Sequence, residues 1–260
     1  MTLTSNREDE TIGLERTRID DHLQAAALTL PLGGLVTLVY FAGFSRFGAS
    51  ELPWKITASA TFLAITVLVC HYFLNRRARR LIWEGVAAMF ALVPTWLLMG
   101  SCWLFYFIFA PMPHWLKWIT LVPCALGTVY WLRIVWKDYA RDVDRLHLVQ
   151  RLYRFDEQRI LYPGADSDMI VATLRQRNPF IWLPVWAISL APLIGALALS
   201  SIEHFESPSG PHMVFLVLSF FSFPMSLWML AYFGLRTVYF HVYLPFKLEA
   251  QTKKKVILAP

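Results

Sequence analysis

The chain has 260 residues, of which 57% are hydrophobic and only 16% are charged, and its formal net charge is +6 at pH 7. Ordinary soluble domains are about 45–50% apolar and about 25% charged, so this composition excludes a soluble globular protein. The basic residues are spread between long apolar runs rather than gathered on one module, which argues against a nucleic-acid-binding protein.

Long stretches without any Asp, Glu, Lys or Arg dominate the chain. Each is as long as the roughly 17–25 residues that a helix needs to cross about 30 Å of hydrocarbon. These stretches are 22–45, 56–75, 85–116, 178–202 and 207–235. A further apolar stretch, 115–136, contains Lys117 and Arg133 near its ends, where long side chains reach the headgroups.

These stretches are predicted to be helices rather than barrel strands. Residues 62–69 are apolar on every face, whereas the residues of barrel strands alternate. Within hydrocarbon, a continuous apolar segment must pair its own backbone groups, which only a helix does. The sequence therefore predicts an all-α polytopic integral membrane protein with six transmembrane helices, at 23–44, 54–74, 83–109, 115–136, 179–201 and 212–236.

Basic residues next to short loops set the orientation of membrane helices. Three segments are rich in them: 76–80 after the second span, 137–178 after the fourth, and the tail 244–260. Six spans place all three segments on one side of the membrane. We therefore predict that both termini, including the N-terminal tail 1–22, are cytoplasmic and that the protein lies in a bacterial inner (plasma) membrane.

The cytoplasmic segment 137–178 is predicted to begin with an amphipathic helix that extends the fourth span. Its apolar residues at helical spacing are Tyr139, Val143, Leu146, Val149 and Leu152. This stripe either rests on the bundle or the headgroups, or docks a cytoplasmic protein partner. Residues 152–162 are either a β-hairpin that turns at 156–158 or a continuation of the helix.

Turn and charge signals mark the remaining soluble parts. Asp166 or Ser167 is predicted to cap a short helix after Pro163 and Gly164. The triplet Asp166, Ser167 and Asp168 resembles the Asp-x-Asp metal motif of nucleotide-sugar transferases over three residues, and we interpret it as capping chemistry. In the tail, Lys253, Lys254 and Lys255 are predicted to meet anionic lipid, at roughly 1 kcal/mol for each base.

Ionisable residues inside a membrane mark functional paths, and few occur here. Glu84 begins the third span, Arg236 ends the sixth, and Arg133 lies at a similar depth. One hypothesis is an inner-leaflet ion pair of Glu84 with Arg236 or Arg133; the alternative is that each side chain reaches the headgroups independently. His71 and His241 map to the same side, where we interpret them as interfacial residues.

Prolines and small residues add two further hypotheses. The prolines near the centres of the third to sixth spans are Pro94, Pro123, Pro192 and Pro224. They predict kinks that free carbonyls for a permeation path, although proline is also common in ordinary membrane helices. The four-residue spacing of Ala187, Ala191 and Gly195 predicts a helix-packing surface in the fifth span.

Standard catalytic signatures do not occur in the sequence. It contains no GxxxxGK[ST], GxGxxG, HExxH or GxSxG pattern, and Cys70, Cys102 and Cys124 lack a metal or disulfide spacing. We therefore predict no catalytic residue, cofactor or metal.

Three functions remain as hypotheses. The leading one is a non-enzymatic inner-membrane protein that acts through helix packing and protein contacts. It would be an accessory or scaffold subunit of a transport, secretion or envelope complex, or an immunity-type protein. The alternatives are a small transporter or channel that uses the proline-kinked helices, and a membrane-embedded transferase that uses Asp166, Asp168 and Glu84.

Overall fold

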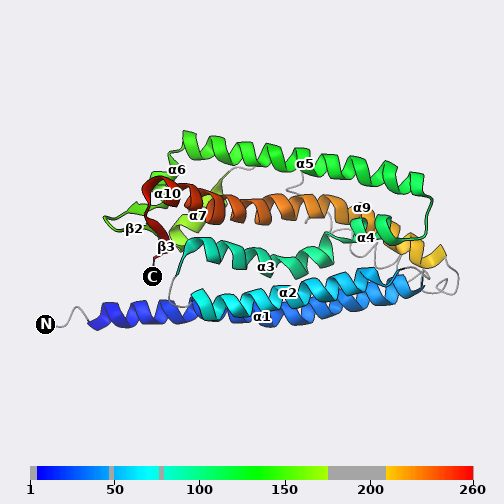
Figure 1. The fold of residues 1–260 in the computed structure, drawn as a ribbon, viewed down its shortest axis with the longest axis horizontal. Helices are drawn as coiled ribbons and strands as arrows, with labels where there is room; N and C mark the ends of the chain where they lie inside the picture. The colour runs from blue at the N-terminus through cyan, green and yellow to red at the C-terminus, as the bar shows by residue number, and fades with distance from the viewer. Residues whose placement is uncertain (1–4, 47–49, 76–78, 175–208, 260) are drawn as a thin grey trace.

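The computed structural model describes residues 5–46, 50–75, 79–174 and 209–259. These parts are mostly helical, and five of their helices are long and apolar enough to cross a membrane. The helices lie roughly parallel in an elongated bundle (Figure 1). The predicted fifth span, 179–201, lies outside the described residues, together with Pro192 and the stripe of Ala187, Ala191 and Gly195.

The first half of the bundle is built by five helices. They are α1 (Ser5–Arg46), α2 (Leu52–Asn75), α3 (Leu81–Met99), α4 (Cys102–Phe109) and α5 (His114–Arg145). Helices α1 and α2 pack closely because Gly33 has no side chain: a Cβ atom there would overlap Thr61. Helix α5 stands on the other side of the bundle, beyond α3 and α9 (Figure 1).

The predicted third span, 83–109, is not one helix. Helix α3 ends at Met99, and α4 begins at Cys102 after Gly100 and Ser101. Gly100 permits this break beside the last helix, because a Cβ atom there would lie 3.2 Å from the Cα of Ser226. The Trp103 N–H at the start of α4 donates to the Ser222 hydroxyl at 3.0 Å. A backbone group that the break frees is therefore satisfied within the protein, as hydrocarbon requires.

The last helical run contains two wide-turned segments. It consists of α9 (Ser209–Met229), the π-helices η1 (Leu230–Leu235) and η2 (Val238–Tyr243), and α10 (Leu244–Thr252). Its apolar helix spans 39 residues, Val214–Thr252. At about 1.5 Å per residue such a helix is nearly twice as long as the hydrocarbon is thick, so α10 projects beyond the apolar layer.

Short strands at one end of the bundle modify the all-α prediction. They are β1 (Arg154–Phe155), β2 (Arg159–Tyr162) and β3 (Lys255–Leu258), which form one sheet in the order β1-β2-β3. Strands β1 and β2 form an antiparallel hairpin, which decides between the two alternatives for 152–162. Strand β3 pairs in parallel with β2, with Ile160 opposite Val256.

We call this end of the molecule the cap: the end of α5, α6 (Leu148–Leu152), the hairpin, α7 (Ala165–Thr173), α10 and β3. Its core is continuous with the helices of the bundle. The fully buried residues of this core include Tyr139, Leu148, Leu152, Tyr153, Ile160, Tyr162, Phe240 and Val256. The predicted tail 244–260 is therefore largely a structural part of the cap rather than a free segment.

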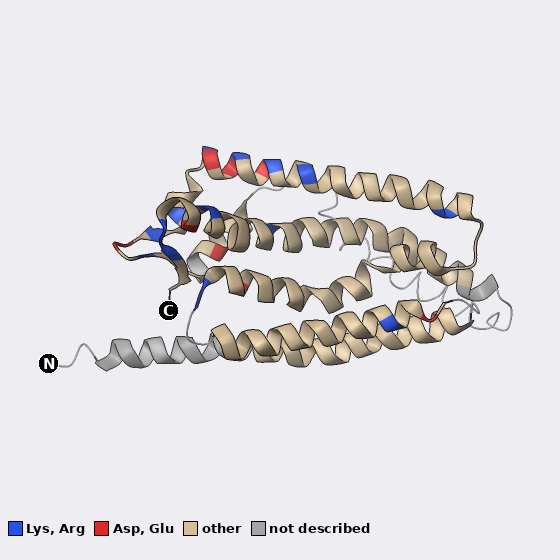
Figure 2. Cartoon of the chain, in the orientation of Figure 1, with Lys and Arg blue, Asp and Glu red and all other residues tan. Residues whose placement is uncertain are grey.

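Charge is concentrated at the cap. Figure 2 shows Lys, Arg, Asp and Glu gathered at the cap end of the bundle, whereas the middle of the bundle is nearly uncharged. Lys55 and Lys117 lie near the starts of α2 and α5, at the opposite end. This distribution matches the division into an apolar body and a basic end that the sequence predicts.

Candidate functional site

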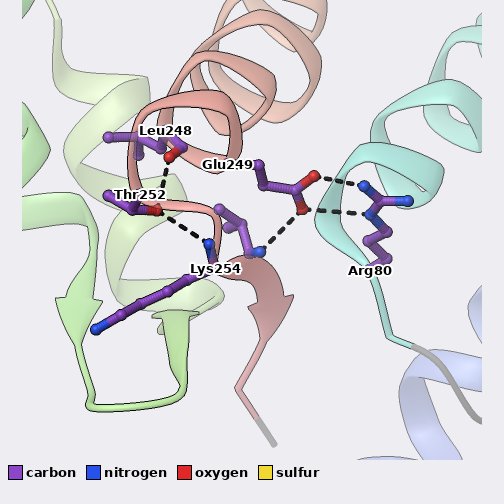
Figure 3. Close-up of polar contacts among 6 residues, drawn as sticks. Arg80, Leu248, Glu249, Thr252 and Lys254 are labelled. Atoms are coloured by element: carbon purple, nitrogen blue, oxygen red, sulfur yellow. Dashed lines mark hydrogen bonds and ion pairs between the residues drawn. The ribbon is translucent and has the colours of Figure 1, made fainter.

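An ion pair fastens the start of α3 to the last helix (Figure 3). The Arg80 guanidinium donates to both carboxylate oxygens of Glu249, from Nε to Oε1 at 3.2 Å and from Nη2 to Oε2 at 2.5 Å. Oε1 also accepts the Val256 N–H at 2.9 Å. The Glu249 side chain is 11% exposed and that of Arg80 is 37% exposed, so the pair is partly shielded from water. One carboxylate thus holds α3, α10 and β3 together.

The ion pair shifts the pKa of both partners. Burial acts to raise the pKa of the Glu249 carboxyl, but hydrogen bonds from Arg80 and the Val256 amide, with the charges of Arg80 and Lys255, outweigh it and lower that pKa. The hydrogen bond to Glu249 raises the pKa of Arg80 against the effect of burial. Both groups are therefore held in their charged forms.

A second polar group joins α2 to α3 just inside the bundle. Glu84 Oε1 lies 3.3 Å from His71 Nε2 and accepts from Asn75 Nδ2 at 3.1 Å. The side-chain Oδ1 of Asn75 accepts the Arg80 N–H at 3.3 Å. His71 and Asn75 are both buried. The first turn of α3 is thereby positioned from two sides, by α2 and by the Glu249 pair.

A third polar group joins the cap to η2. The Tyr162 hydroxyl donates to Asp168 Oδ1 at 2.7 Å, and His241 Nε2 lies 3.2 Å from the same oxygen. Because Gly85 has no side chain, α3 approaches η2 closely at this level: a Cβ there would lie 2.8 Å from the Cβ of His241. Tyr162, Asp168 and His241 thus connect β2, α7 and the last helix.

A cavity of about 340 Å³ opens on the cap between the end of α5, α6 and α7. It combines basic side chains with an apolar lining. The residues that line it are Asp142, Arg145, Leu146, Leu148, Arg151, Ile170, Thr173 and Leu174. Arg145 and Arg151 are exposed, and neither has a carboxylate partner among the described residues. This arrangement can bind an anionic group that is attached to an apolar one.

Polar contacts within the bundle lie along one face of α9. Ser219, Ser222 and Ser226 are all buried there. The Ser226 hydroxyl accepts the Trp96 indole N–H at 2.9 Å, and the Tyr40 and Ser101 hydroxyls lie 2.8 Å apart at the break between α3 and α4. Such hydrogen bonds hold membrane helices together.

The structure gives the predicted ionic residues other contacts. Glu84 meets His71 and Asn75, and the Arg236 guanidinium lies 4.7 Å from the centre of the Tyr232 ring. An ion pair of Glu84 with Arg236 or Arg133 stays a prediction. Pro94, Pro123 and Pro224 lie inside α3, α5 and α9, and their kinks stay predictions as well.

The predicted helix cap at Asp166 or Ser167 is wrong. Helix α7 begins at Ala165, after Gly164, whose φ of 60° favours glycine. The Ser167 hydroxyl donates instead to the Leu152 carbonyl at 3.0 Å. Asp168 contacts Tyr162 and His241 as described above, so it joins α7 to β2 and η2 rather than capping α7.

The Arg80–Glu249 pair and the roles of Tyr162 and His241 were missed from the sequence. One signal was present: Glu249 is the sole acid in the tail 244–260, among four lysines. A lone carboxylate in a basic segment is typical of a fixed ionic contact. Tyr162 and His241 are 79 residues apart, and no local pattern joins them.

Within the described ranges, no group of three or more His, Cys, Asp or Glu side chains is placed to hold a metal ion. The described cysteines Cys70, Cys102 and Cys124 are free thiols. Comparison of the chain with protein-family models, with curated proteins and with solved structures finds no match.

Proposed function

We propose that this protein is a non-enzymatic, multi-pass subunit of a bacterial inner membrane that binds a cytoplasmic protein through its cap. In this role it serves as an accessory or scaffold component of a transport, secretion or envelope complex, or as an immunity-type protein. The basic cap faces the cytoplasm, as the positive-inside rule favours, with both termini on that side of six spans.

The observation that carries this proposal is the set of exposed apolar side chains on the cap. Phe155 at the hairpin is 52% exposed, Met169 on α7 is 69% exposed and Leu146 after α5 is 42% exposed. The sequence around them is charged, so lipid does not account for their exposure. Three large apolar side chains exposed on the same water-facing end of the molecule favour protein association there, as larger apolar patches do.

Photo-crosslinking in living cells tests the proposal. A photoreactive phenylalanine analogue replaces Met169 or Phe155, and Phe62, an apolar residue of α2 that is 73% exposed, is the control position. We expect discrete protein adducts at 169 or 155, identified by mass spectrometry, and lipid adducts at 62. The absence of protein adducts at both cap positions, in cells that express the chain at its natural level, would refute a docking role.

The break between α3 and α4 favours a second candidate, a small transporter or channel. Tyr40 and Ser101 place hydroxyl groups at this break, and interrupted helices line substrate sites in many transporters. Flux into proteoliposomes, compared between the native chain and Pro224→Ala, tests this candidate. A flux that is absent, or that the substitution leaves unaltered, removes it.

A further inference from the structure

We propose that the cavity between the end of α5, α6 and α7 binds an acidic, apolar peptide segment of the cytoplasmic partner. The guanidinium groups of Arg145 and Arg151 bind a carboxylate of that segment, and an adjacent apolar side chain packs on the cavity lining. This inference rests on the proposed docking function and assigns its chemistry.

The charge of the cavity selects an anion. Among the described residues that line it are two guanidinium groups and one carboxylate, that of Asp142, and these leave an excess of one positive charge. Two other arginines of the cap are already paired: Arg141 lies 3.2 Å from Asp138, and Arg159 lies 3.9 Å from Asp156. Arg145 and Arg151 are available to an incoming carboxylate. A guanidinium group can bind a carboxylate in a bidentate geometry.

The apolar lining selects a peptide rather than a simple anion. Leu146, Ile170 and Leu174 form part of the wall, and Leu146 is 42% exposed. A free phosphate ion would leave this wall in water. The volume of about 340 Å³ lies at the small end of ligand pockets, which suits one or two side chains.

The position of the cavity argues against a lipid headgroup. Arg145 ends α5 nine residues after Trp136, where the apolar part of that helix ends. At about 1.5 Å per residue, Arg145 lies about 13 Å beyond this point, and α5 runs along the bundle axis (Figure 1). The headgroup layer of one leaflet is only about 5–8 Å thick, so the cavity faces water.

Peptide binding to the full chain in nanodiscs of zwitterionic lipid tests the inference. The probes are fluorescein-labelled twelve-residue peptides that combine Glu with Leu and Trp, and the same peptides with Gln in place of Glu. We expect fluorescence anisotropy to show that the Glu peptides bind and that the Gln peptides bind at least about tenfold more weakly. We also expect Arg145→Glu with Arg151→Glu, and Ile170→Glu alone, to weaken binding by a similar factor.

The matched control is Arg154→Glu with Arg159→Glu, which reverses two exposed charges on the hairpin of the same cap. It should change the affinity by less than about threefold, a change that salt-screened long-range charge accounts for. Equal thermal midpoints of the two double variants show that both remain folded. Equal loss of binding in both would overturn the inference, because any basic surface would then suffice.

The remaining outcomes separate this inference from the proposed function. It is overturned if no Glu peptide binds, or if Arg145→Glu with Arg151→Glu abolishes binding to phosphatidylglycerol vesicles but leaves peptide binding intact. If crosslinks at Met169 persist in that double variant, the partner docks elsewhere on the cap: the cavity inference fails and the docking function stands. If crosslinks are missing from the native chain, the docking function itself fails.

Discussion

Arg80 and Glu249, which are 169 positions apart, form a bidentate ion pair between the start of α3 and α10. The same carboxylate accepts the Val256 N–H of β3. Removing one partner leaves a partly buried charge without its counterion, which costs more than the loss of an exposed ion pair. The stability of the cap therefore depends strongly on these two residues.

Glu249→Gln keeps the shape of the side chain and removes its charge. We expect the free energy of unfolding to fall by about 1–3 kcal/mol, measured by denaturation in mild detergent. A double-mutant cycle with Arg80→Ala should yield a coupling energy of similar size. The control is Glu51→Gln, which breaks the exposed Lys55–Glu51 pair and should cost less than about 1 kcal/mol. Equal effects at both sites would contradict the assigned role of Glu249.

The lowered pKa of Glu249 predicts how this contribution depends on pH. A carboxyl whose folded pKa is depressed stabilises the protein above its unfolded pKa, about 4.3, and loses this effect as pH falls through the folded value. The difference in stability between the native chain and Glu249→Gln should therefore be constant from neutral pH to about 5 and shrink at lower pH. A difference that grows on acidification would contradict it.

The buried contact of β3 with β2 predicts a local effect of Val256→Asn. The Val256 side chain is fully buried, and an unsatisfied amide there should cost about 1–3 kcal/mol. We expect trypsin to cut the hairpin after Arg154 or Arg159 faster than in the native chain. Lys255→Asn, at the exposed neighbouring position of β3, should leave the cleavage rate unchanged. Similar rates in both variants would show that β3 does not hold the hairpin.

The close approach of α3 to η2 predicts opposite results at two glycines. In Gly85→Ala the new Cβ would lie 3.1 Å from the backbone carbon of His241, so the helices must separate and the thermal midpoint should fall. In Gly127→Ala of α5 the new Cβ meets nothing within 4 Å, and better helix propensity should maintain or raise the midpoint. A fall at both positions would point to a general intolerance of alanine.

The proposed cytoplasmic orientation of the cap predicts the labelling of introduced cysteines. In a chain with Cys70, Cys102 and Cys124 replaced by alanine, an impermeant maleimide should label His114→Cys in intact spheroplasts. Glu157→Cys and Gln251→Cys should react only after the membrane is opened, because they lie on the opposite side. Labelling of His114→Cys and Glu157→Cys from the same side would mean that α5 does not cross the membrane.

Local chemistry made the apolar helices predictable. Runs without charge along α1, α2, α3 and α9 identify helices long enough to cross a membrane, because each residue contributes independently to the cost of entering lipid. The hairpin turn at 156–158 was also visible as one of two alternatives. The break after Met99 could not be predicted from the sequence. It depends on Gly100, whose missing side chain lets the backbone of α9 approach closely, and this is a contact between residues that are distant in the sequence.

The cap shows where sequence patterns stop being informative. Lys253, Lys254 and Lys255 indicate a basic tail. Whether this tail joins the cap depends on the pairing of Val256 in β3 with Ile160 in β2, which lies 96 positions away. The cavity depends on the placement of α7 beside α5, which follows from the turn at Gly164. Of the predicted amphipathic stripe, Tyr139, Val143 and Leu152 are buried, Val149 is partly buried and Leu146 is 42% exposed.

The wide turns η1 and η2 fix the spacing between the membrane body and the cap. A π-turn accommodates more residues than an α-turn, and each residue of a helix advances the side chains by about 100°. A wide turn within Leu230–Leu235 can tighten to regular winding and so absorb the deletion of one residue, whereas a deletion from the regular winding of α9 would swing Glu249 about a quarter-turn away from Arg80. Among variants of this chain, single-residue deletions should therefore be better tolerated in Leu230–Leu235 than in α9.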